Sequence, residues 1–581
     1  MRTGIIEYET DFKKRSRVRI KNQIGEYHMN KAGKAGMAVL AVAAAAAVAV
    51  TVQEAEQMKQ ETQTEMAGPE KTAGNNAAVV SGSADSSTGG SSVTAADYTA
   101  VVSPEHISKI NGGRFEGWGT SLCWWANRIG YSDTLSKQAA ADFFGKDGLQ
   151  LNIVRYNIGG GDDPSHDHIT RTDSEMPGYA VNASYDEKSG NCTWDYDWTQ
   201  DANQRNVLNQ ALAAYGDDLI VEAFSNSPPY FMTKSGCSSG AVISRQNNLK
   251  DDCYDDFARY LADVSAHFRK EWGITFQSID PMNEPNTDYW KAMSEKQEGC
   301  HFDPGDSQSE MLVDMRSALD KEGLTGTILC GTDETDIDKQ IVSYNVLTDE
   351  AKAALGRIDT HSYIGSKRTQ LSALAQKEGK NLWMSEVDGG DTAGVGAVQM
   401  GAGLWLAQRI TTDMNQMTPS AWILWQAIDS HISKDGYQGK KDSGMVDVNS
   451  SYWGLAVADH DKQEVILTMK YYAFGQFTRF IRPGYEIISV DDQTLAAYDP
   501  EGHQLVIVTT NADVNDKTAD FDLSGFKTVG ADAGVTRTSG SAEDGEKWAV
   551  LDPVAVQNQS LQVTLKGNSV TTFVIPETML Q

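Results

Sequence analysis

Eight short apolar runs between residues 115 and 426 constrain the fold of this chain more than any other feature. Each run ends in polar, glycine or proline residues, and the segments between them are long enough to form helices. The runs cover residues 115–118, 151–158, 219–224, 276–280, 327–331, 357–361, 382–386 and 422–426. Strands that alternate with helices in this number are typical of a closed parallel barrel, so we predict an α/β protein with a (β/α)8 TIM barrel.

The segments between the runs carry helical periodicity, and the C-terminal part of the chain does not. Large apolar residues recur three and four positions apart at Tyr254, Phe257, Tyr260, Leu261, Val264 and Phe268. After Tyr485 the pattern changes to alternating runs separated by Gly, Asp and Asn, at 505–509, 519–523, 548–551, 561–565 and 570–575. This change predicts a C-terminal antiparallel β-sandwich, to which residues 98–110 are expected to add a strand or two.

We expect five segments along the chain. These are a basic tail at 1–34, an uncharged apolar segment at 35–52, a linker at 53–97, the barrel at 98–481 and the β-sandwich at 482–581. The linker consists mainly of Gln, Glu, Ser, Thr, Gly and Ala, and it holds no aromatic residue. Such a composition buries too little apolar surface to offset the entropy lost on ordering.

The N-terminal region predicts export. Nine Lys and Arg residues precede an apolar segment of 18 uncharged residues at 35–52. This pattern matches a signal peptide, and its length also reaches the lower limit for a membrane-spanning helix. Either interpretation carries the following residues out of the cytoplasm, so we expect a secreted or cell-surface protein. Membrane anchoring through 35–52 stays open.

The charge balance argues against a nucleic-acid partner. The chain holds 50 Lys and Arg residues and 80 Asp and Glu residues, which gives a net charge of −30. Nucleic-acid binding requires a basic face that neutralises phosphates. The sequence also shows neither a Walker A motif nor a dinucleotide-binding glycine motif at a strand-to-helix turn. No cofactor is therefore predicted.

Two glutamates close runs of the predicted barrel. Glu284 follows the fourth run, between Asn283 and Pro285, and Glu386 ends the seventh run. Catalytic groups of TIM barrels lie at the C-terminal ends of the strands, so barrel closure would bring these two residues together. Paired carboxyl groups in this position are typical of glycoside hydrolases, in which one protonates the leaving oxygen and the other attacks the anomeric carbon or activates water.

Several motifs together resemble a known family. The Asn-Glu-Pro sequence after the fourth strand, with a Glu after the seventh, is the pattern of the retaining clan of (β/α)8 glycoside hydrolases. Residues 117–126, residues 155–161 and the trailing β domain are similar to glycoside hydrolase family 30, and within it to the endo-β-1,6-galactanase branch. The resemblance covers residues 98–581 and leaves the tail and the linker unexplained.

The resemblance implies a function and a set of roles. It implies a retaining hydrolysis of a β-linked polysaccharide in two steps, with Glu284 as the acid/base and Glu386 as the nucleophile. Glu284 must then stay protonated until a sugar oxygen departs, whereas Glu386 must be ionised to attack. Asn283 would donate to the sugar 2-hydroxyl, and Tyr363 would hydrogen-bond the nucleophile.

Four further residues are candidates for the substrate pocket. Arg155 and His361 are expected at the floor of the pocket. Two structural roles are equally open: a buried ion pair for Arg155, and a core histidine with satisfied hydrogen bonds for His361. Trp118 and Trp425 close the first and eighth strands, and sugars stack their flat C–H faces on such rings. Each indole could equally belong to the core. Aromatic residues in loops after strand ends, such as Trp124, Trp125 and Trp290, are weaker candidates.

The polar loop after the second run contains several residues of types that bind metal ions. Asp162, Asp163, His166, Asp167 and His168 are crowded there. The sequence lacks an H-E-x-x-H or similar ligand spacing. We therefore predict no metal, and expect this loop to hydrogen-bond sugar hydroxyls.

Two other local patterns concern residues 236–253. The sequence Gly-Cys-Ser-Ser-Gly at 236–240 matches the G-x-S-x-G elbow of serine hydrolases, but it lacks the preceding strand and following helix that the elbow needs. Cys237 and Cys253 flank a segment rich in Gly, Ser, Asn and Asp, so we expect them to form a disulfide in an oxidising environment. The other four cysteines cannot be paired from the sequence.

Two functions of other classes stay open beside the enzyme. One is a carbohydrate-binding protein on an inactive barrel, and the other is a tethered adhesive module. The presence of both glutamates favours the enzyme. β-1,6-Galactan is the expected substrate, β-1,6-glucan the runner-up and xylan a third, while the exact glycan and endo or exo action stay undetermined.

Overall fold

The computed structural model describes residues 96–389, 398–436 and 453–581. The expected basic tail, the apolar segment 35–52 and nearly all of the linker lie outside these residues. Among the helices of the described ranges, none combines the length and the apolar character that a bilayer span requires.

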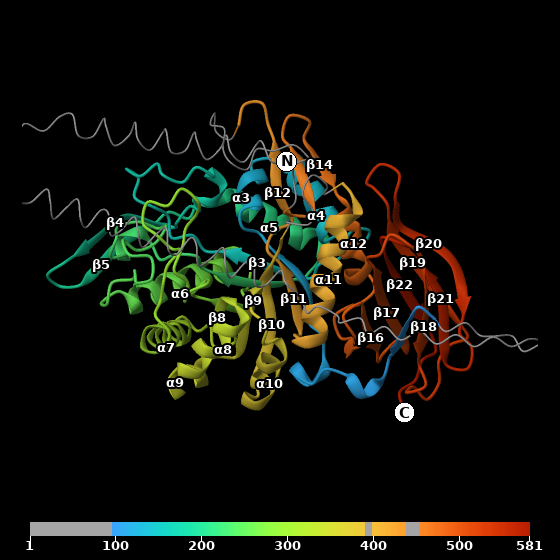
Figure 1. Ribbon diagram of the computed structural model, residues 1–581. Helices are drawn as coiled ribbons and strands as arrows, with labels where there is room; N and C mark the ends of the chain where they lie inside the picture. Colours follow the sequence, from blue (N-terminus) through green and yellow to red (C-terminus); the bar gives the residue numbers. More distant parts are fainter. Residues whose placement is uncertain (1–95, 390–397, 437–452) are drawn as a thin grey trace, which may run out of the picture. The chain divides into compact units, whose positions relative to one another are not determined.

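Eight parallel strands close a barrel in the order β10-β11-β2-β3-β6-β7-β8-β9 (Figure 1). Their bounds are β2 Gly117–Ser121, β3 Ile153–Asn157, β6 Ile220–Phe224, β7 Ser278–Asp280, β8 Ile328–Asp336, β9 Arg357–Ile364, β10 Asn381–Val387 and β11 Ala421–Leu424. Each strand overlaps one of the eight predicted runs, in the same order. The predicted (β/α)8 fold class is therefore confirmed.

Helices surround the barrel and bury their apolar faces against it (Figure 1). Their bounds are α3 Trp125–Ile129, α4 Asp133–Phe143, α5 Ala202–Tyr215, α6 Tyr254–Glu271, α7 Asp306–Lys321, α8 Ile337–Val346, α9 Asp349–Ala354, α10 Arg368–Glu378, α11 Met400–Gln416 and α12 Met469–Thr478. Helix α6 carries the predicted periodicity, and all six of its apolar residues named above are buried. Asp336 is the N-cap of helix α8, and its side chain accepts from the backbone N–H of Asp338.

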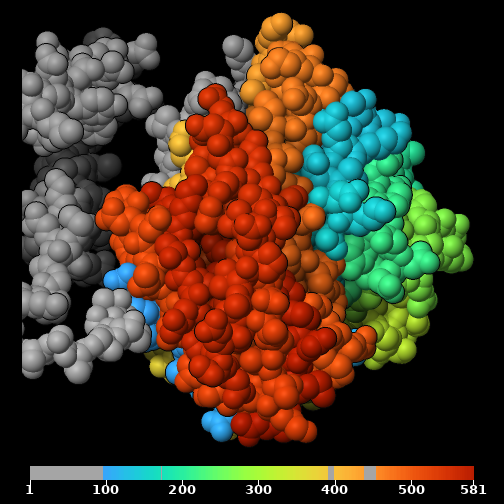
Figure 2. All heavy atoms as spheres, turned by 90° about the vertical axis from the view of Figure 1, so that its right-hand side faces the viewer, coloured from blue at the N-terminus to red at the C-terminus, as the bar shows by residue number. Residues whose placement is uncertain are grey.

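The C-terminal residues form a β-sandwich of two sheets. The larger sheet has the order β15-β16-β17-β22-β19-β20, and the smaller has the order β1-β18-β21. The bounds are β1 Tyr98–Val101, β15 Glu486–Ser489, β16 Thr494–Asp499, β17 Gln504–Asn511, β18 Lys517–Asp522, β19 Asp532–Ser539, β20 Glu546–Ala555, β21 Ser560–Leu565 and β22 Ser569–Ile575. The N-terminal strand β1 pairs with β18, so both ends of the described chain contribute to this domain. In the space-filling view, the C-terminal residues in red cover the face turned to the reader (Figure 2).

Helices α11 and α12 lie between the barrel and the sandwich (Figure 1), and both contact strands of the larger sheet. This interface contains Trp118. Its indole is fully buried, its Nε1 donates to Ile481 O at 2.8 Å, and its ring packs against Phe474 and Phe477. The prediction that Trp118 forms a sugar platform is therefore wrong. Successive side chains of a strand point to opposite faces, and Trp118 occupies the face that points away from the barrel axis.

Two small sheets extend the loops of the barrel. The hairpin of β4 (Ala180–Asp186) and β5 (Asn191–Tyr196) follows β3, and the sheet β12-β13-β14 follows β11. The bounds of the latter strands are Ile428–Ile432, Ala456–Asp459 and Glu464–Leu467. None of these five strands was predicted from the sequence.

Candidate active site

Glu284 and Glu386 lie at one pocket of about 450 Å³ at the C-terminal ends of the barrel strands. Glu284 follows β7 in a backbone conformation with φ of 47°, which is uncommon outside glycine. Its backbone N–H donates to Asp333 O at 3.0 Å, so strand β8 fixes this conformation. Glu386 belongs to β10 itself. Both side chains are largely buried, at 8% and 4% exposed.

His361 bridges the two glutamates from β9. Its Nδ1 lies 3.2 Å from Glu284 Oε1 and 3.3 Å from Glu386 Oε1. One carboxylate oxygen of each glutamate and a ring nitrogen of His361 all lie within 4.8 Å of one another. The closed barrel therefore brings together two carboxyl groups that are distant in sequence.

Arg155 supports this arrangement from β3, below the pocket. Its Nη1 lies 3.2 Å from Glu386 Oε2, its Nη2 lies 2.7 Å from Asp333 Oδ2, and its Nε lies 2.9 Å from Glu222 Oε1. Arg155, Glu222 and Asp333 are fully buried. Ionised groups at such depth are stable only when paired, so this network fixes the position of Glu386.

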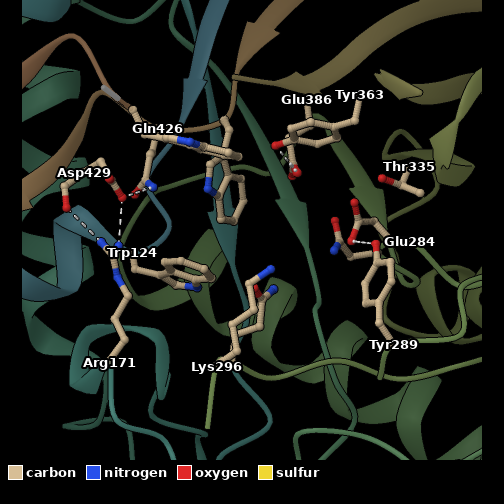
Figure 3. A pocket seen from close by; sticks show the side chains of 14 residues that line it. Trp124, Arg171, Glu284, Tyr289, Lys296, Thr335, Tyr363, Glu386, Gln426 and Asp429 are labelled. Carbon is tan, nitrogen blue, oxygen red and sulfur yellow. Dashed lines mark hydrogen bonds and ion pairs between the residues drawn. The ribbon is translucent and has the colours of Figure 1, made fainter. Parts of the chain in front are cut away.

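Two tyrosines donate to the glutamates (Figure 3). The Tyr363 hydroxyl donates to Glu386 Oε1 at 3.1 Å, and the Tyr289 hydroxyl donates to Glu284 Oε2. The Thr335 side chain also hydrogen-bonds Glu284. Tyr363 was identified from the sequence, whereas Tyr289 was missed because it lies in an irregular loop without periodicity.

The charges around the pair give the two carboxyl groups different proton affinities. Burial raises the pKa of Glu386 to about 7, an effect that the Glu284 charge reinforces and His361 opposes. Burial acts in the same direction on Glu284, but hydrogen bonds and the charge of His361 outweigh it and lower the pKa of Glu284. The order of the two pKa values is therefore the reverse of the one expected from the roles of an acid and a nucleophile.

The charge state of His361 follows from its neighbours. Burial alone would lower the pKa of His361, but the charges of Glu386 and Asp333 raise it well above its usual value. The imidazolium then donates from Nδ1 between the two glutamates and faces Asp333 Oδ2 with Nε2, at 3.2 Å. His361 thus supplies a buried positive charge directly beneath the reacting groups.

Aromatic side chains form the opposite wall of the pocket. Trp124 and Trp425 meet edge to face with ring centroids 5.1 Å apart, and Tyr363 stacks on Trp453 at 6.2 Å. Trp425, Trp124 and Trp453 all line the pocket, as a sugar platform would. Trp290 and Trp125 do not line the pocket: Trp290 Nε1 donates to Glu284 O, and Trp125 packs on Phe143.

Polar residues complete the rim (Figure 3). Arg171 lies over the Trp124 ring at 4.9 Å and pairs with Asp429 at 2.8 Å. Asp429 also accepts from Gln426. The remaining polar lining residues are Asn283, Lys296, Gln297 and Thr335. Of these, Asn283 alone was predicted from the sequence. Lys296 and Gln297 come from the long loop after β7, and Thr335 lies in β8 beyond the predicted run 327–331.

The predicted disulfide is not formed. Cys237 and Cys253 carry free thiols. Cys253 Sγ lies 3.4 Å from Cys192 Sγ, whereas Cys237 Sγ lies 3.3 Å from His168 Nε2. The expected Cys237–Cys253 pair is therefore wrong, because the hairpin β4–β5 brings Cys192 to the start of α6 and the loop carrying Cys237 turns toward His168.

Comparisons with known proteins identify the family. The profile described as O-glycosyl hydrolase family 30 matches residues 111–345. The chain is 32% identical over 509 residues to the endo-beta-1,6-galactanase of Hypocrea rufa, which covers 84% of this chain and 96% of that protein. It is 24% identical to the exo-beta-1,6-galactobiohydrolase of Bifidobacterium longum subsp. longum, over 72% of this chain and 35% of that protein.

A solved structure agrees in fold. The catalytic domain of the GH30 xylanase C from Talaromyces cellulolyticus superposes with a TM-score of 0.60 at 18% identity, over 82% of this chain and 99% of that chain. The family resemblance predicted from the Asn-Glu-Pro sequence and the first two strand motifs is confirmed. The chain belongs to glycoside hydrolase family 30 and is an O-glycosyl hydrolase.

Proposed function

We propose that the chain hydrolyses β-1,6-linked galactan with retention of anomeric configuration, with Glu284 as the acid/base and Glu386 as the nucleophile. The observation that carries the proposal is the approach of the two carboxyl groups, whose nearest oxygens lie within 4.8 Å. Retaining glycosidases place the two groups about 5–5.5 Å apart, whereas inverting enzymes leave about 6.5–9.5 Å for a water molecule. The pair in this pocket corresponds to the retaining spacing.

The partners of each glutamate support the assignment of roles. Glu386 pairs with Arg155, whose guanidinium stays charged throughout, and accepts from Tyr363 on its other oxygen. This environment suits a carboxylate that attacks as an anion. Glu284 has no arginine partner among the described residues, and its ion pair runs to His361, which it shares with Glu386. Glu284 can therefore gain and lose a proton during the cycle.

The reaction then proceeds in two displacements. Glu386 attacks the anomeric carbon, the bond to the leaving oxygen breaks, and Glu284 transfers its proton to that oxygen. In the second step a water molecule gives a proton to Glu284 and attacks the anomeric carbon, and the ester bond to Glu386 breaks. The product has the configuration of the substrate, and both glutamates return to their initial states.

Substrate binding supplies the proton arrangement that the first step needs. The charges around the pair favour the shared proton on Glu386 rather than on Glu284. The leaving sugar oxygen can only accept a hydrogen bond from Glu284, and the bound sugar excludes water. Both changes raise the proton affinity of Glu284. The shared proton therefore moves to Glu284 when the substrate binds.

Unpartnered polar atoms and aromatic rings fit a sugar in the pocket. Asn283 Oδ1 is buried and has no hydrogen-bond partner among the described residues, so a sugar hydroxyl could donate to it. The Asn283 amide is also well placed to donate to the sugar 2-hydroxyl. Trp425 and Trp124 offer apolar faces at the other side of the pocket.

The relatives support galactan over the alternatives. Both relatives named above carry β-1,6-galactan or its fragments in their names, and one of them aligns over nearly its full length. β-1,6-Glucan is the alternative, because glucose differs from galactose at the 4-hydroxyl alone, and xylan follows. A carbohydrate-binding function without catalysis is less consistent with two carboxyl groups at this spacing.

Variants of the two glutamates test the roles. Glu386→Gln should abolish turnover of every substrate, whereas Glu284→Gln should still cleave an activated aryl β-galactoside, whose departure needs no proton. Azide should rescue Glu386→Ala with an inverted product and Glu284→Ala with a retained one. Glu295→Gln, at an exposed carboxyl group on a neighbouring loop, serves as the control and should keep full activity.

A substrate panel tests the specificity. The chain is incubated with β-1,6-galactan, β-1,6-glucan and glucuronoxylan, and the products are separated by size. Preferential release of galactose oligomers supports the proposal, and a mixture of lengths at early times indicates endo action. Faster release from glucan or xylan would replace the substrate assignment without altering the roles of the glutamates. Binding without release would favour the non-enzymatic alternative.

Export is a further part of the proposal. The basic residues of 1–34 and the uncharged segment 35–52 support secretion or anchoring at the cell surface. N-terminal sequencing of the protein isolated from culture medium and from membranes tests both forms. A chain that starts at Ala96 should keep full activity. Recovery of the intact chain in the cytoplasm would contradict export.

A further inference from the structure

Four side chains with metal-binding atoms converge outside the catalytic pocket. Asp162, His166 and His168 come from the loop after β3, and Cys237 comes from the loop after β6. One ligand atom of each lies within 4.8 Å of every other. We propose that these four residues bind one Zn²⁺ ion, which holds together three loops around the active site.

The spacing of the ligand atoms suits a tetrahedral ion. Asp162 Oδ1 lies 3.2 Å from His166 Nδ1, and Asp162 Oδ2 lies 2.9 Å from His168 Nε2. Cys237 Sγ lies 3.3 Å from His168 Nε2 and 4.0 Å from Asp162 Oδ2. With Zn–N bonds of about 2.0–2.1 Å and a Zn–S bond of about 2.3 Å, the ligand atoms of a tetrahedral site lie roughly 3.3–3.6 Å apart. Small side-chain movements therefore suffice to admit the ion.

The hydrogen bonding of His168 calls for a cation at this point. His168 Nδ1 lies 2.6 Å from the carbonyl oxygen of Ser294, which can accept but cannot donate. Nδ1 therefore carries a hydrogen. The lone pair of a neutral ring then lies on Nε2 and faces the oxygen of Asp162 and the sulfur of Cys237. A metal ion at this point accepts this lone pair, and metal-binding histidines commonly donate their other N–H to a carbonyl in this way.

Contacts within the loops hold Cys237 and Asp162 in place. The sulfur is buried, the backbone N–H of Met293 donates to it at 3.4 Å, and Ser239 Oγ lies 3.2 Å away. Asp162 is fixed in turn, since its Oδ1 accepts from the backbone N–H of Ser238 at 3.0 Å. A thiolate and two imidazoles select Zn²⁺ over Mg²⁺ or Ca²⁺, and four protein ligands form a closed, structural site.

The position of the cluster gives the ion a structural role. Ser294 and Met293, which contact His168 and Cys237, belong to the loop after β7. The same loop carries Tyr289, which donates to Glu284, and Lys296, which lines the pocket. The ion therefore connects the loops after β3, β6 and β7, and it supports a wall of the active site without contacting the reacting atoms.

A close approach of the backbones makes this meeting possible. A Cβ on Gly160 would lie 2.6 Å from the carbonyl oxygens of Ser227 and Pro228, so glycine is required where the loop after β3 passes the loop after β6. The two patterns that the sequence analysis set aside, the polar loop at 162–168 and the Gly-Cys-Ser-Ser-Gly segment, thus become neighbours. Separation in sequence concealed the fourth ligand.

Metal analysis and cobalt substitution test the proposal on the full chain without an affinity tag. After gel filtration, plasma mass spectrometry should find about one zinc ion per chain. Exchange for Co²⁺ should produce a thiolate-to-cobalt charge-transfer band in the near ultraviolet. Cys237→Ser should lose this band, and His168→Gln should lose most of the bound metal. Cys300→Ser, at a buried thiol outside the cluster, and Asp163→Asn, next to a ligand, should retain both signals.

A measurement on the wild-type chain keeps the test independent of variant folding. Chelator-treated protein is titrated with Zn²⁺ against a chromophoric chelator, and its melting temperature is recorded with and without the ion. Submicromolar affinity for one ion and a rise in melting temperature support the site. Failure to bind Zn²⁺ at micromolar concentration, or a cobalt band that survives Cys237→Ser, would overturn it.

Discussion

The hydroxyl of Tyr289 donates a hydrogen bond to Oε2 of Glu284 (Figure 3). This bond lowers the pKa of Glu284. Tyr289→Phe should therefore raise that pKa, and the acidic limb of the pH profile of kcat/KM should move upward by about one unit, as expected for a hydrogen bond to a charged group. Tyr131→Phe, at an exposed tyrosine on another loop, should leave the limb in place. An unchanged acidic limb in Tyr289→Phe would show that the bond does not control Glu284.

The pH profile of the wild-type enzyme should be bell-shaped, because catalysis needs one proton on the pair. Activity should fall at low pH, where both glutamates are protonated and no nucleophile remains. It should also fall above about pH 7, where the pair loses its last proton, since the higher pKa of the pair is about 7. Measurement of kcat/KM against pH gives the two pKa values of the glutamate pair in the free enzyme.

A variant separates the two limbs of that profile. In Glu284→Ala, cleavage of an activated aryl β-galactoside needs no acid, so the loss of activity at high pH should disappear while the acidic limb remains. Persistence of the alkaline limb in this variant would assign the higher pKa to a group outside the pair.

Trp118 and Trp425 should respond to substitution in opposite ways. Trp118 packs between the barrel and α12, so Trp118→Ala should lower the free energy of unfolding by about 3–5 kcal/mol while the folded fraction keeps its kcat/KM. Trp425 lines the pocket, so Trp425→Ala should lower kcat/KM by roughly tenfold or more through lost stacking. Urea unfolding and steady-state kinetics measure the two effects. A catalytic loss in Trp118→Ala without a stability loss would contradict this placement.

Cys192 and Cys253 should form a disulfide under oxidising conditions. Their sulfur atoms lie 3.4 Å apart, where β5 meets the start of α6. On exposure to glutathione disulfide, the two thiols should lose two protons and two electrons to the oxidant and join through an S–S bond. Titratable thiols in the denatured chain should then fall from six to four. Peptide mapping that pairs Cys237 with Cys253 instead would contradict the arrangement of these loops.

The strands of the barrel were predictable because each is a continuous apolar run. A strand buried on both faces needs apolar residues throughout, and this signal survives without knowledge of its neighbours. Hairpin β4–β5 carries no such run, because exposed residues alternate with buried or half-buried ones along both strands. The sandwich strand β19 was missed for a similar reason, since its sequence is interrupted by Gly534 and by polar residues.

The candidate site was predictable only where a residue ends a strand. Glu284 and Glu386 follow from strand position, because the C-terminal ends of barrel strands point to one place, whereas His361 and Arg155 were expected from the family resemblance. Tyr289 and Lys296 come from a long loop, and their positions depend on contacts with other loops. Trp118 shows that a position near the end of a strand is not sufficient to predict a pocket residue. A strand residue faces either the pocket or the surrounding helices, and a run that is apolar throughout does not indicate which.

The configuration of the first product tests the central claim most directly. The wild-type enzyme is mixed with a β-linked galactan oligomer, and proton NMR follows the anomeric signals before mutarotation equilibrates them. Attack by Glu386, whose carboxylate lies within 4.8 Å of Glu284, predicts that the β-anomer appears first and the α-anomer grows in later at the rate of mutarotation. Initial appearance of the α-anomer would show that water attacks directly, and the roles proposed for both glutamates would have to be withdrawn.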